Sequence, residues 1–281
     1  MRVSVICPVY NGENYLKSLF SKIREQENVS FLEIIAPISK SKDNSLEEAK
    51  KYADLAYEVS NFNHGKTRHE AALKANGEYL VFITQDIMPV DNLWLYNLVK
   101  DLNENCIAAF SKQIAYKEHG EIEKLIREFN YPDIKRVCNK ESSKINGRKN
   151  IFYSDAASAV LKTEFFKLGG YDFIVPTNED VILANNIINN GKSFIYEPKS
   201  KVYHSHKLSF KETYKRYKAI GKFEKLYSKE IDFSNTNGEG KKMVYFVIKK
   251  LLQKRKILDI GYFGLDMTVR LLGYKSGEDD E

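Results

Sequence analysis

Short apolar runs alternate with amphipathic stretches from the start of the chain to Pro89. The runs are rich in β-branched and aromatic residues and predict buried strands at Val3 to Cys7, Glu33 to Ile38, Ala56 to Val59 and Tyr79 to Ile83. Apolar residues at helical spacing predict intervening helices at Tyr15 to Ile23, Leu46 to Tyr52 and Arg68 to Lys74. Such alternation indicates a mostly parallel sheet flanked by helices, so the predicted fold class is α/β.

The pattern is less regular beyond Pro89. It predicts helices at Asp91 to Leu102, Glu164 to Leu168 and Val181 to Asn190, and strands at Ile107 to Phe110, Phe194 to Glu197 and Val202 to His206. Residues 113–150 are rich in lysine and show no clear period. We therefore expect an irregular, mobile excursion in that segment.

The C-terminal part of the chain has a helical pattern with many basic residues. Apolar residues recur every three or four positions from Ser209 to Lys229, and a polar break follows at residues 234–240. Charged residues interrupt the next two segments, Met243 to Lys256 and Ile257 to Tyr274. We therefore expect residues 208–281 to form an amphipathic helical extension that does not span a membrane.

Composition is that of a soluble globular protein. Of the 281 residues, 43% are hydrophobic and 29% are charged, and no apolar run approaches the roughly 20 residues that a spanning helix needs. The apolar part of the amino terminus is too short for a signal peptide and fits a buried strand, so we expect a cytoplasmic protein. Cys7, Cys106 and Cys138 match no metal or redox spacing and are expected to be free thiols.

The net charge of +6 is modest and does not suggest nucleic acid binding. Basic residues nevertheless concentrate after Lys199. Amphipathic Lys/Arg helices can lie on anionic lipid, where each basic residue contributes about 1 kcal/mol. The extension could instead pack as a solvated helical layer or form a homodimer interface, and the pattern alone leaves these alternatives open.

Candidate chemistry begins where the strand predicted at Tyr79 to Ile83 runs into Thr84-Gln85-Asp86. Ligands of open α/β sheets bind at the carboxyl ends of strands, which is where Asp86 would stand. Arg68 and the free amides of the preceding helix start would face the same crevice and suit a phosphate. Asp86 could also simply begin a turn before Pro89.

Six motifs occur in a fixed order over roughly residues 1–225. They are Cys7-Pro8-Val9-Tyr10-Asn11, His64-Gly65-Lys66-Thr67-Arg68, Thr84-Gln85-Asp86, Phe129-Asn130-Tyr131-Pro132, Asn178-Glu179-Asp180 and Val202-Tyr203-His204-Ser205-His206. With these motifs the chain resembles the inverting family-2 glycosyltransferases of GT-A fold, and among them the bacterial rhamnosyltransferases that build surface polysaccharides.

The resemblance implies a division of the chain. A GT-A domain would occupy residues 1–207, with a nucleotide-sugar half at 1–110 and an acceptor and catalytic half at 111–207. The basic amphipathic helical extension would follow at 208–281. In similar enzymes the loop after the first strand wraps the nucleotide, which here implies Pro8, Tyr10 and Glu13. The positions that match the nucleotide-sugar and diphosphate contacts are Arg68, Gln85 and Asp86.

The resemblance also implies a divalent metal, Mn²⁺ or Mg²⁺. The usual Asp-x-Asp motif is Thr84-Gln85-Asp86 here, so one potential ligand is missing. Asp86 and the imidazole of His204 would hold the ion together with diphosphate oxygens, and His206 ranks below His204. A histidine ligand favours Mn²⁺ over Mg²⁺. His204 could alternatively be a strand-end histidine that bonds to the backbone.

Catalytic and acceptor residues are implied in the same way. Asp180 matches the general base of the family, with Glu179 beside it, although acidic residues at a helix start also act as simple caps. The acceptor side would be flanked by Gln113, Asn130, Tyr131, Asp155 and Ser158. Tyr131-Pro132 could equally be an ordinary turn in a loop.

The donor implied by the resemblance is dTDP-L-rhamnose, and the acceptor is a lipid-linked or growing glycan. The second strand ends in Ile38, where the family has an acidic residue that contacts the base, so base selectivity is open. UDP-glucose, UDP-galactose or a UDP-N-acetylhexosamine is the alternative donor. A non-catalytic glycan-binding module is a further alternative. An acceptor on a lipid carrier would place the protein at the inner face of the cell membrane.

Overall fold

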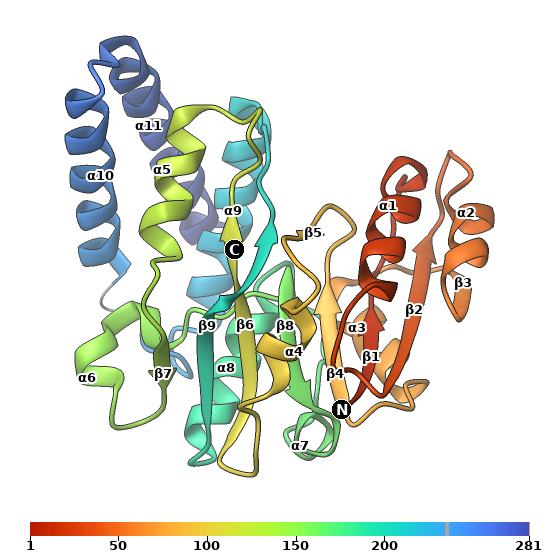
Figure 1. Cartoon of the computed structure of the whole chain (residues 1–281). Helices are drawn as coiled ribbons and strands as arrows, with labels where there is room; N and C mark the ends of the chain where they lie inside the picture. The colour runs from red at the N-terminus through yellow and green to blue at the C-terminus, as the bar shows by residue number, and fades with distance from the viewer. Residues whose placement is uncertain (234–235, 281) are drawn as a thin grey trace.

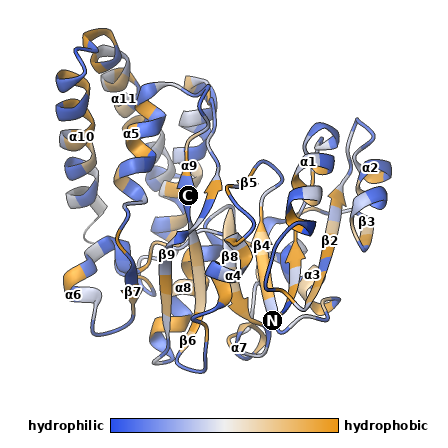
Figure 2. Ribbon diagram, in the orientation of Figure 1, coloured by the Kyte–Doolittle hydropathy of each residue, from blue (hydrophilic) through white to orange (hydrophobic). Residues whose placement is uncertain are grey.

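A single mixed sheet of nine strands runs through the computed structural model, which describes residues 1–233 and 236–280. The strands lie in the order β3-β2-β1-β4-β8-β6-β9-β5, and β7 pairs with β9 beside this path. Helices cover both faces of the sheet, and three C-terminal helices stand to one side of it (Figure 1). Apolar colouring is concentrated on the strands, whereas the C-terminal helices carry mixed surfaces (Figure 2).

The first half of the sheet is parallel, as the sequence predicts. It contains β1 (Arg2–Ile6), β2 (Phe31–Ser39), β3 (Leu55–Val59) and β4 (Tyr79–Ile83). The connecting helices are α1 (Glu13–Arg24), α2 (Ser45–Tyr52) and α3 (His64–Leu73). Helix α3 begins at His64, earlier than expected, because the Asn63 side chain caps it by accepting from the Lys66 amide at 3.0 Å.

The second half of the sheet is mixed. β8 (Ala157–Leu161) lies antiparallel between β4 and β6 (Cys106–Ile114), and β9 (Ser193–Tyr203) runs parallel to β6. The sequence predicted two strands where β9 is one, because a register shift at Ser111 and Lys112 lets β9 continue past Pro198. Two short antiparallel strands, β5 (Met88–Pro89) and β7 (Arg136–Cys138), complete the sheet.

Residues 113–150 are more regular than expected, and that prediction was wrong. They contain the end of β6, α5 (Glu121–Asn130), β7, α6 (Ser143–Asn146) and the 3-10 turn η1 (Gly147–Asn150). Helix α5 has an apolar face that includes Leu125 and Ile126, and this face packs against Val247, Leu251 and Phe263 of the C-terminal helices. The helix is therefore stabilised by partners more than a hundred residues away in the sequence.

The remaining helices of the main domain are α4 (Trp94–Val99), α7 (Lys162–Lys167) and α8 (Glu179–Asn189). Apolar side chains fill the space between helices and sheet on both faces. On one face Trp94 is fully buried, and its indole Nε1 donates to Ser111 Oγ at 2.9 Å. The opposite face is lined by aromatic residues, among them Phe82, Phe110 and Tyr171.

The C-terminal extension consists of α9 (Phe210–Leu226), α10 (Thr236–Gln253) and α11 (Ile257–Asp279). The predicted polar break begins at residues 234–235, which lie outside the described residues, and its remainder is already helical in α10. Throughout 1–233 and 236–280, the described helices are too short or too polar to cross a membrane.

Glycines bring α9 and α11 into backbone contact. An added Cβ would lie 2.1 Å from Tyr274 O at Gly221, 2.5 Å from Tyr214 O at Gly273 and 2.0 Å from Lys218 O at Gly277. Only glycine fits at such distances, so the two helices pack closer together than larger residues would allow. In Figure 1, α5 and α11 lie between α10 and α9.

Candidate active site

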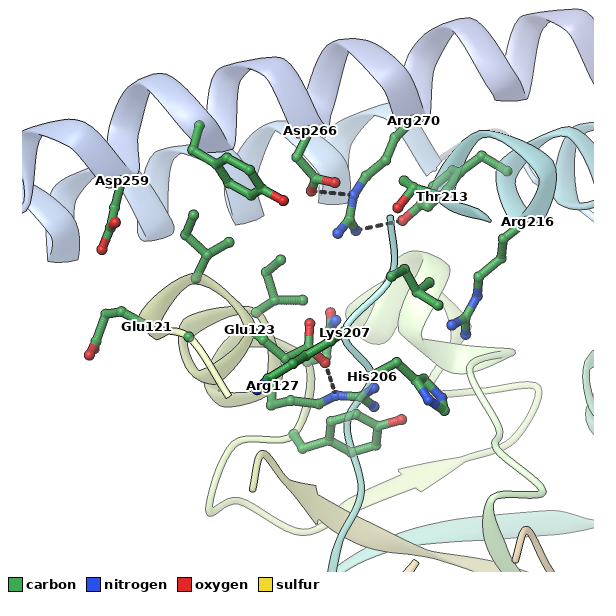
Figure 3. Close-up of a pocket in the computed structure, with 18 of the residues that line it drawn as sticks. Glu121, Glu123, Arg127, His206, Lys207, Thr213, Arg216, Asp259, Asp266 and Arg270 are labelled. Atoms are coloured by element: carbon green, nitrogen blue, oxygen red, sulfur yellow. Dashed lines mark hydrogen bonds and ion pairs between the residues drawn. The ribbon is translucent and has the colours of Figure 1, made fainter. Parts of the chain in front are cut away.

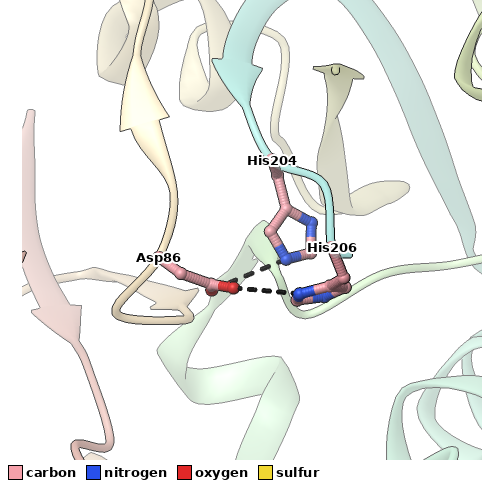
Figure 4. A group of neighbouring side chains, drawn as sticks. All are labelled: Asp86, His204 and His206. Carbon is pink, nitrogen blue, oxygen red and sulfur yellow. Dashed lines mark ion pairs between the residues drawn. The ribbon is translucent and has the colours of Figure 1, made fainter. Parts of the chain in front are cut away.

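A carboxylate and two imidazoles meet beyond the carboxyl ends of β4 and β9. Asp86 follows β4, and His204 and His206 follow β9 (Figure 4). His204 Nε2 lies 3.5 Å from Asp86 Oδ1, and His206 Nδ1 lies 3.3 Å from Asp86 Oδ2. The potential ligand atoms of the three residues all lie within 4.8 Å of one another. Segments separated by more than a hundred residues in the sequence thus form one cluster.

The ring of His204 is held by Gln113 of β6. Gln113 Nε2 donates to Ser154 Oγ at 2.9 Å, and Arg127 Nη1 donates to Gln113 Oε1, so the amide orientation is fixed. His204 Nδ1 lies 2.8 Å from the same Oε1 and must therefore carry the proton. The lone pair of His204 is consequently on Nε2, the atom that faces Asp86.

The electrostatics keep this cluster as one anion with two neutral rings. Burial alone would raise the pKa of Asp86, but His204, Thr84 and His206 outweigh it and hold the pKa well below its usual value. Burial lowers the pKa of His204 despite the nearby carboxylate. Burial and the His204 ring also lower the pKa of His206, to about 4. Both imidazoles are therefore available as ligands at neutral pH.

These residues fit a divalent cation. His204 Nε2 is buried without a hydrogen-bond partner, and it aims a lone pair at a carboxylate that also can only accept. A cation between two such acceptors would satisfy both of them. Two imidazoles and one carboxylate suit Mn²⁺ and other borderline ions better than an all-oxygen ion such as Ca²⁺. His206 completes this set, and its spacing from His204, one residue between them, was the sequence signal for it.

The loop between β1 and α1 forms the expected nucleotide side. Tyr10 is 54% exposed, so its ring is free to stack on a base. Gln85 accepts from Tyr10 N at 2.8 Å and donates to Tyr10 O at 2.9 Å, which positions that loop. The carboxylate of Glu13 accepts from the Asn44 backbone at 3.0 Å and so also caps α2. Pro8 precedes this loop at the end of β1.

Arg68 has a different neighbour from the one its motif implies. Its Nη1 lies 2.9 Å from Glu179 Oε1, and the two side chains are only 4% and 9% exposed. The same Nη1 donates to His64 O at 3.1 Å. The guanidinium therefore joins α3 to the start of α8, and its contact with a donor diphosphate stays a prediction.

Asp180 stands beside this ion pair in the first turn of α8. Its Oδ1 accepts from its neighbour Val181 N at 2.9 Å, and its Oδ2 accepts from Asp155 N at 3.3 Å. Burial raises the pKa of Asp180 well above its usual value, and the charges of Asp155 and Glu179 raise it further. A carboxyl with a raised pKa is a stronger base when ionised. The geometry therefore suits the role of proton acceptor.

Asp155 belongs to the same group of acids. Burial raises the pKa of Asp155 to about 6, with Glu179 adding to the rise and Arg68 opposing it. Ser158 Oγ donates to Asp155 Oδ1 at 2.7 Å. The carboxyl groups of Asp155, Glu179 and Asp180 therefore lie near a single cation, Arg68. Acidic groups are in excess around Asp180.

The residues expected on the acceptor side differ in their surroundings. Gln113 is 2% exposed and supports His204, and Asp155 is 4% exposed beneath Asp180. Asn130 and Tyr131, at the end of α5, line a cavity that also reaches His206. Arg127 and Arg216 line the same cavity, and sequence reasoning missed both of them because basic residues are frequent in these segments.

We expect the Arg68→Met variant to lose about 3–5 kcal/mol of its free energy of unfolding, because Glu179 would remain buried without its cation. Urea denaturation with and without the substitution measures this loss. The double variant Arg68→Met with Glu179→Gln removes both charges and should recover part of it. If Arg68→Met is as stable as the wild type, the pair does not anchor α8.

Three comparisons with known proteins agree with this geometry. The model of glycosyl transferase family 2 matches residues 4–169. The O-antigen chain rhamnosyltransferase RfbN of Salmonella typhimurium is 28% identical over 284 residues, which cover 99% of this chain and 90% of RfbN. WbaN of Salmonella anatum, also an O-antigen chain rhamnosyltransferase, is 28% identical, over 98% of this chain and 89% of its own.

Solved structures show the same fold at low identity. The mannosyltransferase PcManGT from Pyrobaculum calidifontis, in complex with GDP-Man and Mn²⁺, has a TM-score of 0.68 at 15% identity, covering 100% of this chain and 88% of its own. Staphylococcus aureus TarS 1–349 with UDP-GlcNAc has a TM-score of 0.61 at 15% identity, covering 89% of this chain and 73% of its own. Because the family model covers more than half of the chain, this protein belongs to glycosyl transferase family 2 and is a glycosyltransferase of GT-A fold.

Proposed function

We propose that this enzyme transfers L-rhamnose from dTDP-L-rhamnose to a lipid-linked or growing glycan, with inversion at the anomeric carbon. The observation that carries the proposal is the cluster of Asp86, His204 and His206 at the carboxyl ends of β4 and β9. The choice of rhamnose is supported by two relatives, both O-antigen chain rhamnosyltransferases, that are similar over nearly the whole chain.

The cluster would hold the donor through a divalent metal, with Mn²⁺ preferred. Asp86 would supply an oxygen, and His204 and His206 would supply nitrogens, as the free lone pair of His204 Nε2 suggests. A bound divalent ion supplies positive charge next to a departing diphosphate. Gln113 would contribute indirectly by fixing the proton of His204 on Nδ1.

Asp180 would act as the general base. A hydroxyl oxygen of the acceptor forms a bond to the anomeric carbon while the bond from that carbon to the diphosphate oxygen breaks. The hydroxyl proton moves to a carboxylate oxygen of Asp180, and the diphosphate leaves with the electron pair of the broken bond. Glu179 would not take the proton, since Arg68 pairs with it; it would hold the start of α8 in place.

The nucleotide would bind at the loop between β1 and α1. The exposed ring of Tyr10 offers a stacking surface for the base, and Gln85 fixes the backbone of Tyr10 from below. Asp43, in the loop after β2, holds the starts of α1 and α2, because its two oxygens accept from Glu13 N and Ser45 N at 3.1 Å each. Base selectivity would therefore depend on the loop between β1 and α1 more than on the end of β2.

A location at the inner face of the cell membrane would suit a lipid-linked acceptor. The start of α11 exposes Ile257 and Leu258, at 73% and 91%, directly after the basic residues Lys254, Arg255 and Lys256 of the preceding turn. Exposed apolar residues beside cations are typical of peripheral contact with anionic lipid. A homodimer through the same helices is the alternative, and co-sedimentation with anionic vesicles separates the two.

Thermal denaturation with a panel of donors and Mn²⁺ tests the donor. We expect dTDP-L-rhamnose at 100 times its Kd to add about 2.7 kcal/mol to the free energy of unfolding, because it binds only the folded state. UDP-glucose, UDP-galactose and UDP-N-acetylglucosamine at equal concentration should stabilise less. A larger shift with any of the uridine donors would contradict rhamnose as the sugar, and no shift with any donor would contradict nucleotide-sugar binding as a whole.

A further inference from the structure

A cavity of about 650 Å³ lies between α5, α9 and α11. Its polar walls come from these helices and include Glu123, Arg127, Tyr217, Tyr262, Asp266 and Arg270 (Figure 3). The volume falls within the range of about 300–1,000 Å³ that is typical of small-molecule sites. The C-terminal extension thus supplies one wall of this cavity, and the main domain supplies the other.

The inner end of the cavity reaches the reaction centre. His206 lines it, as do Asn130, Tyr131 and Phe152. The rings of Tyr131 and Phe152 pack together with centroids 5.5 Å apart. Burial raises the pKa of Tyr131, and the charge of Asp180 contributes to the rise. A ligand in the cavity would end beside His206 of the metal cluster.

Two ion pairs lie in the walls of the cavity, Glu123 with Arg127 near the inner end and Asp266 with Arg270 on α11. Glu123 Oε1 lies 2.8 Å from Arg127 Nε, and Asp266 Oδ2 lies 2.7 Å from Arg270 Nε. Arg270 Nη1 also donates to the hydroxyl of Tyr217 at 2.8 Å. Groups held in this way present fixed donors and acceptors but little net charge, which suits the hydroxyl groups of an uncharged ligand.

The overall balance of charge supports the same conclusion. Among the described residues that line the cavity, four are acidic (Glu121, Glu123, Asp259 and Asp266) and four are basic (Arg127, Lys207, Arg216 and Arg270). Figure 3 shows Glu121 and Asp259 at one end and Arg216 with His206 at the other. Only the inner end is therefore cationic, where the diphosphate of the donor would lie.

Aromatic rings complete the lining. Tyr262 is 51% exposed, and one side of its ring stacks on Phe210 with centroids 5.3 Å apart. Pyranose rings present an apolar face of C–H groups and an edge of hydroxyls, so a site for them combines flat apolar surfaces with fixed polar groups. The cavity has both.

We infer that this cavity binds the acceptor as an uncharged glycan, with the attacking hydroxyl at the His206 end and the rest of the chain between α5 and α11. This inference rests on the proposed function, since it assigns the acceptor of the same reaction. A lipid-linked diphosphate would be a poor occupant of the part lined by α11, because Arg270 there is already paired with Asp266. The C-terminal extension is accordingly part of the acceptor site.

Saturation-transfer NMR tests the inference with neutral probes. The probes are the methyl glycosides of galactose, mannose, rhamnose and N-acetylglucosamine, with inorganic pyrophosphate as the charged comparison. We expect at least one glycoside to bind the wild type, and Tyr262→Ala to weaken that binding at least tenfold. Tyr262→Phe keeps the ring and should restore it.

Tyr245→Ala is the matched control. Tyr245 lies on α10, is 69% exposed and does not line the cavity, so its loss should leave glycoside binding unchanged. Three results would overturn the inference. Tyr262→Ala could bind the glycoside as well as the wild type, none of the glycosides could bind, or pyrophosphate could displace the bound glycoside. Thermal stabilisation by dTDP-L-rhamnose is measured on every variant. If the donor still stabilises them, a negative glycoside result contradicts only the acceptor site and not the proposed donor.

Discussion

Replacing Asp180 with Asn should lower the rate of glycosyl transfer by about 10²–10⁴-fold, the usual contribution of a positioned general base. The amide keeps the size of the side chain but cannot accept the proton of the acceptor hydroxyl. Binding of dTDP-L-rhamnose should persist, because Asp180 is not one of the three side chains grouped as potential metal ligands. Initial rates, with nucleotide-sugar binding measured by calorimetry, show whether only the chemical step is lost.

Asp172→Asn is the matched control for this substitution. Asp172 is exposed and shortly precedes α8, so the same chemical change there should leave the rate unaltered. Transfer by Asp180→Asn at the rate of the wild type would remove Asp180 from the role of base. Asp155→Asn would then be the next variant to measure, since Asp155 is its nearest acidic neighbour through the backbone contact.

The pH dependence of transfer by the wild type should also reveal the base Asp180. A base works when ionised, so the rate falls as the pH drops through the pKa of that group. Burial, Asp155 and Glu179 raise the pKa of Asp180. The acidic limb of the rate profile should therefore lie at a higher pH than an ordinary aspartate would give, and Asp180→Asn should remove this limb from the residual activity.

Loss of the metal cluster should have the second large effect. Asp86→Asn should weaken Mn²⁺ binding at least 100-fold and lower transfer by on the order of 10²–10³, because charge on the leaving diphosphate would be left unbalanced. Chelation of the wild type should abolish activity, and added Mn²⁺ should restore it. Titration of Mn²⁺ followed by electron paramagnetic resonance measures the affinity directly.

Asp133→Asn serves as the control for this second substitution. Its side chain is 76% exposed and pairs with Lys112 at the surface, so its loss should change neither metal binding nor rate. Full activity in the presence of a chelator would remove Asp86, His204 and His206 from metal binding. Mn²⁺ binding of normal strength by Asp86→Asn would show that the ion lies elsewhere.

The parallel half of the sheet could be predicted from sequence because its signals are local. Each strand from β1 to β3 is an apolar run with a helix after it, and β4 ends this series, so the alternation predicts parallel pairing. Helix α5 was missed although Ile122, Leu125, Ile126 and Phe129 recur at helical spacing, because the lysine-rich segment around it was read as one irregular excursion. Its apolar residues pack on α10 and α11, and no local pattern identifies partners so far along the chain.

The candidate site shows the same limit. Motifs singled out Asp86 and His204, whose side chains lie together in the structure, and the roles of Asp86, His204 and Asp180 stay predictions. They did not show that Glu179 neutralises Arg68, since a buried ion pair between residues 111 positions apart is a property of the fold. They also left Gln113 on the acceptor side, whereas its amide orients His204.

The backbone contact of α9 with α11 fixes how far apart these two helices stand. At Gly221, Gly273 and Gly277 no space for a side chain remains between the two backbones, so a shift of α11 toward α9 would cause a steric collision. The distance between α9 and α11 at the wall of the glycan cavity is therefore fixed by these three glycines. Homologues that accept bulkier or slimmer glycans would have to differ in the residues that face inward, because the frame itself tolerates no adjustment.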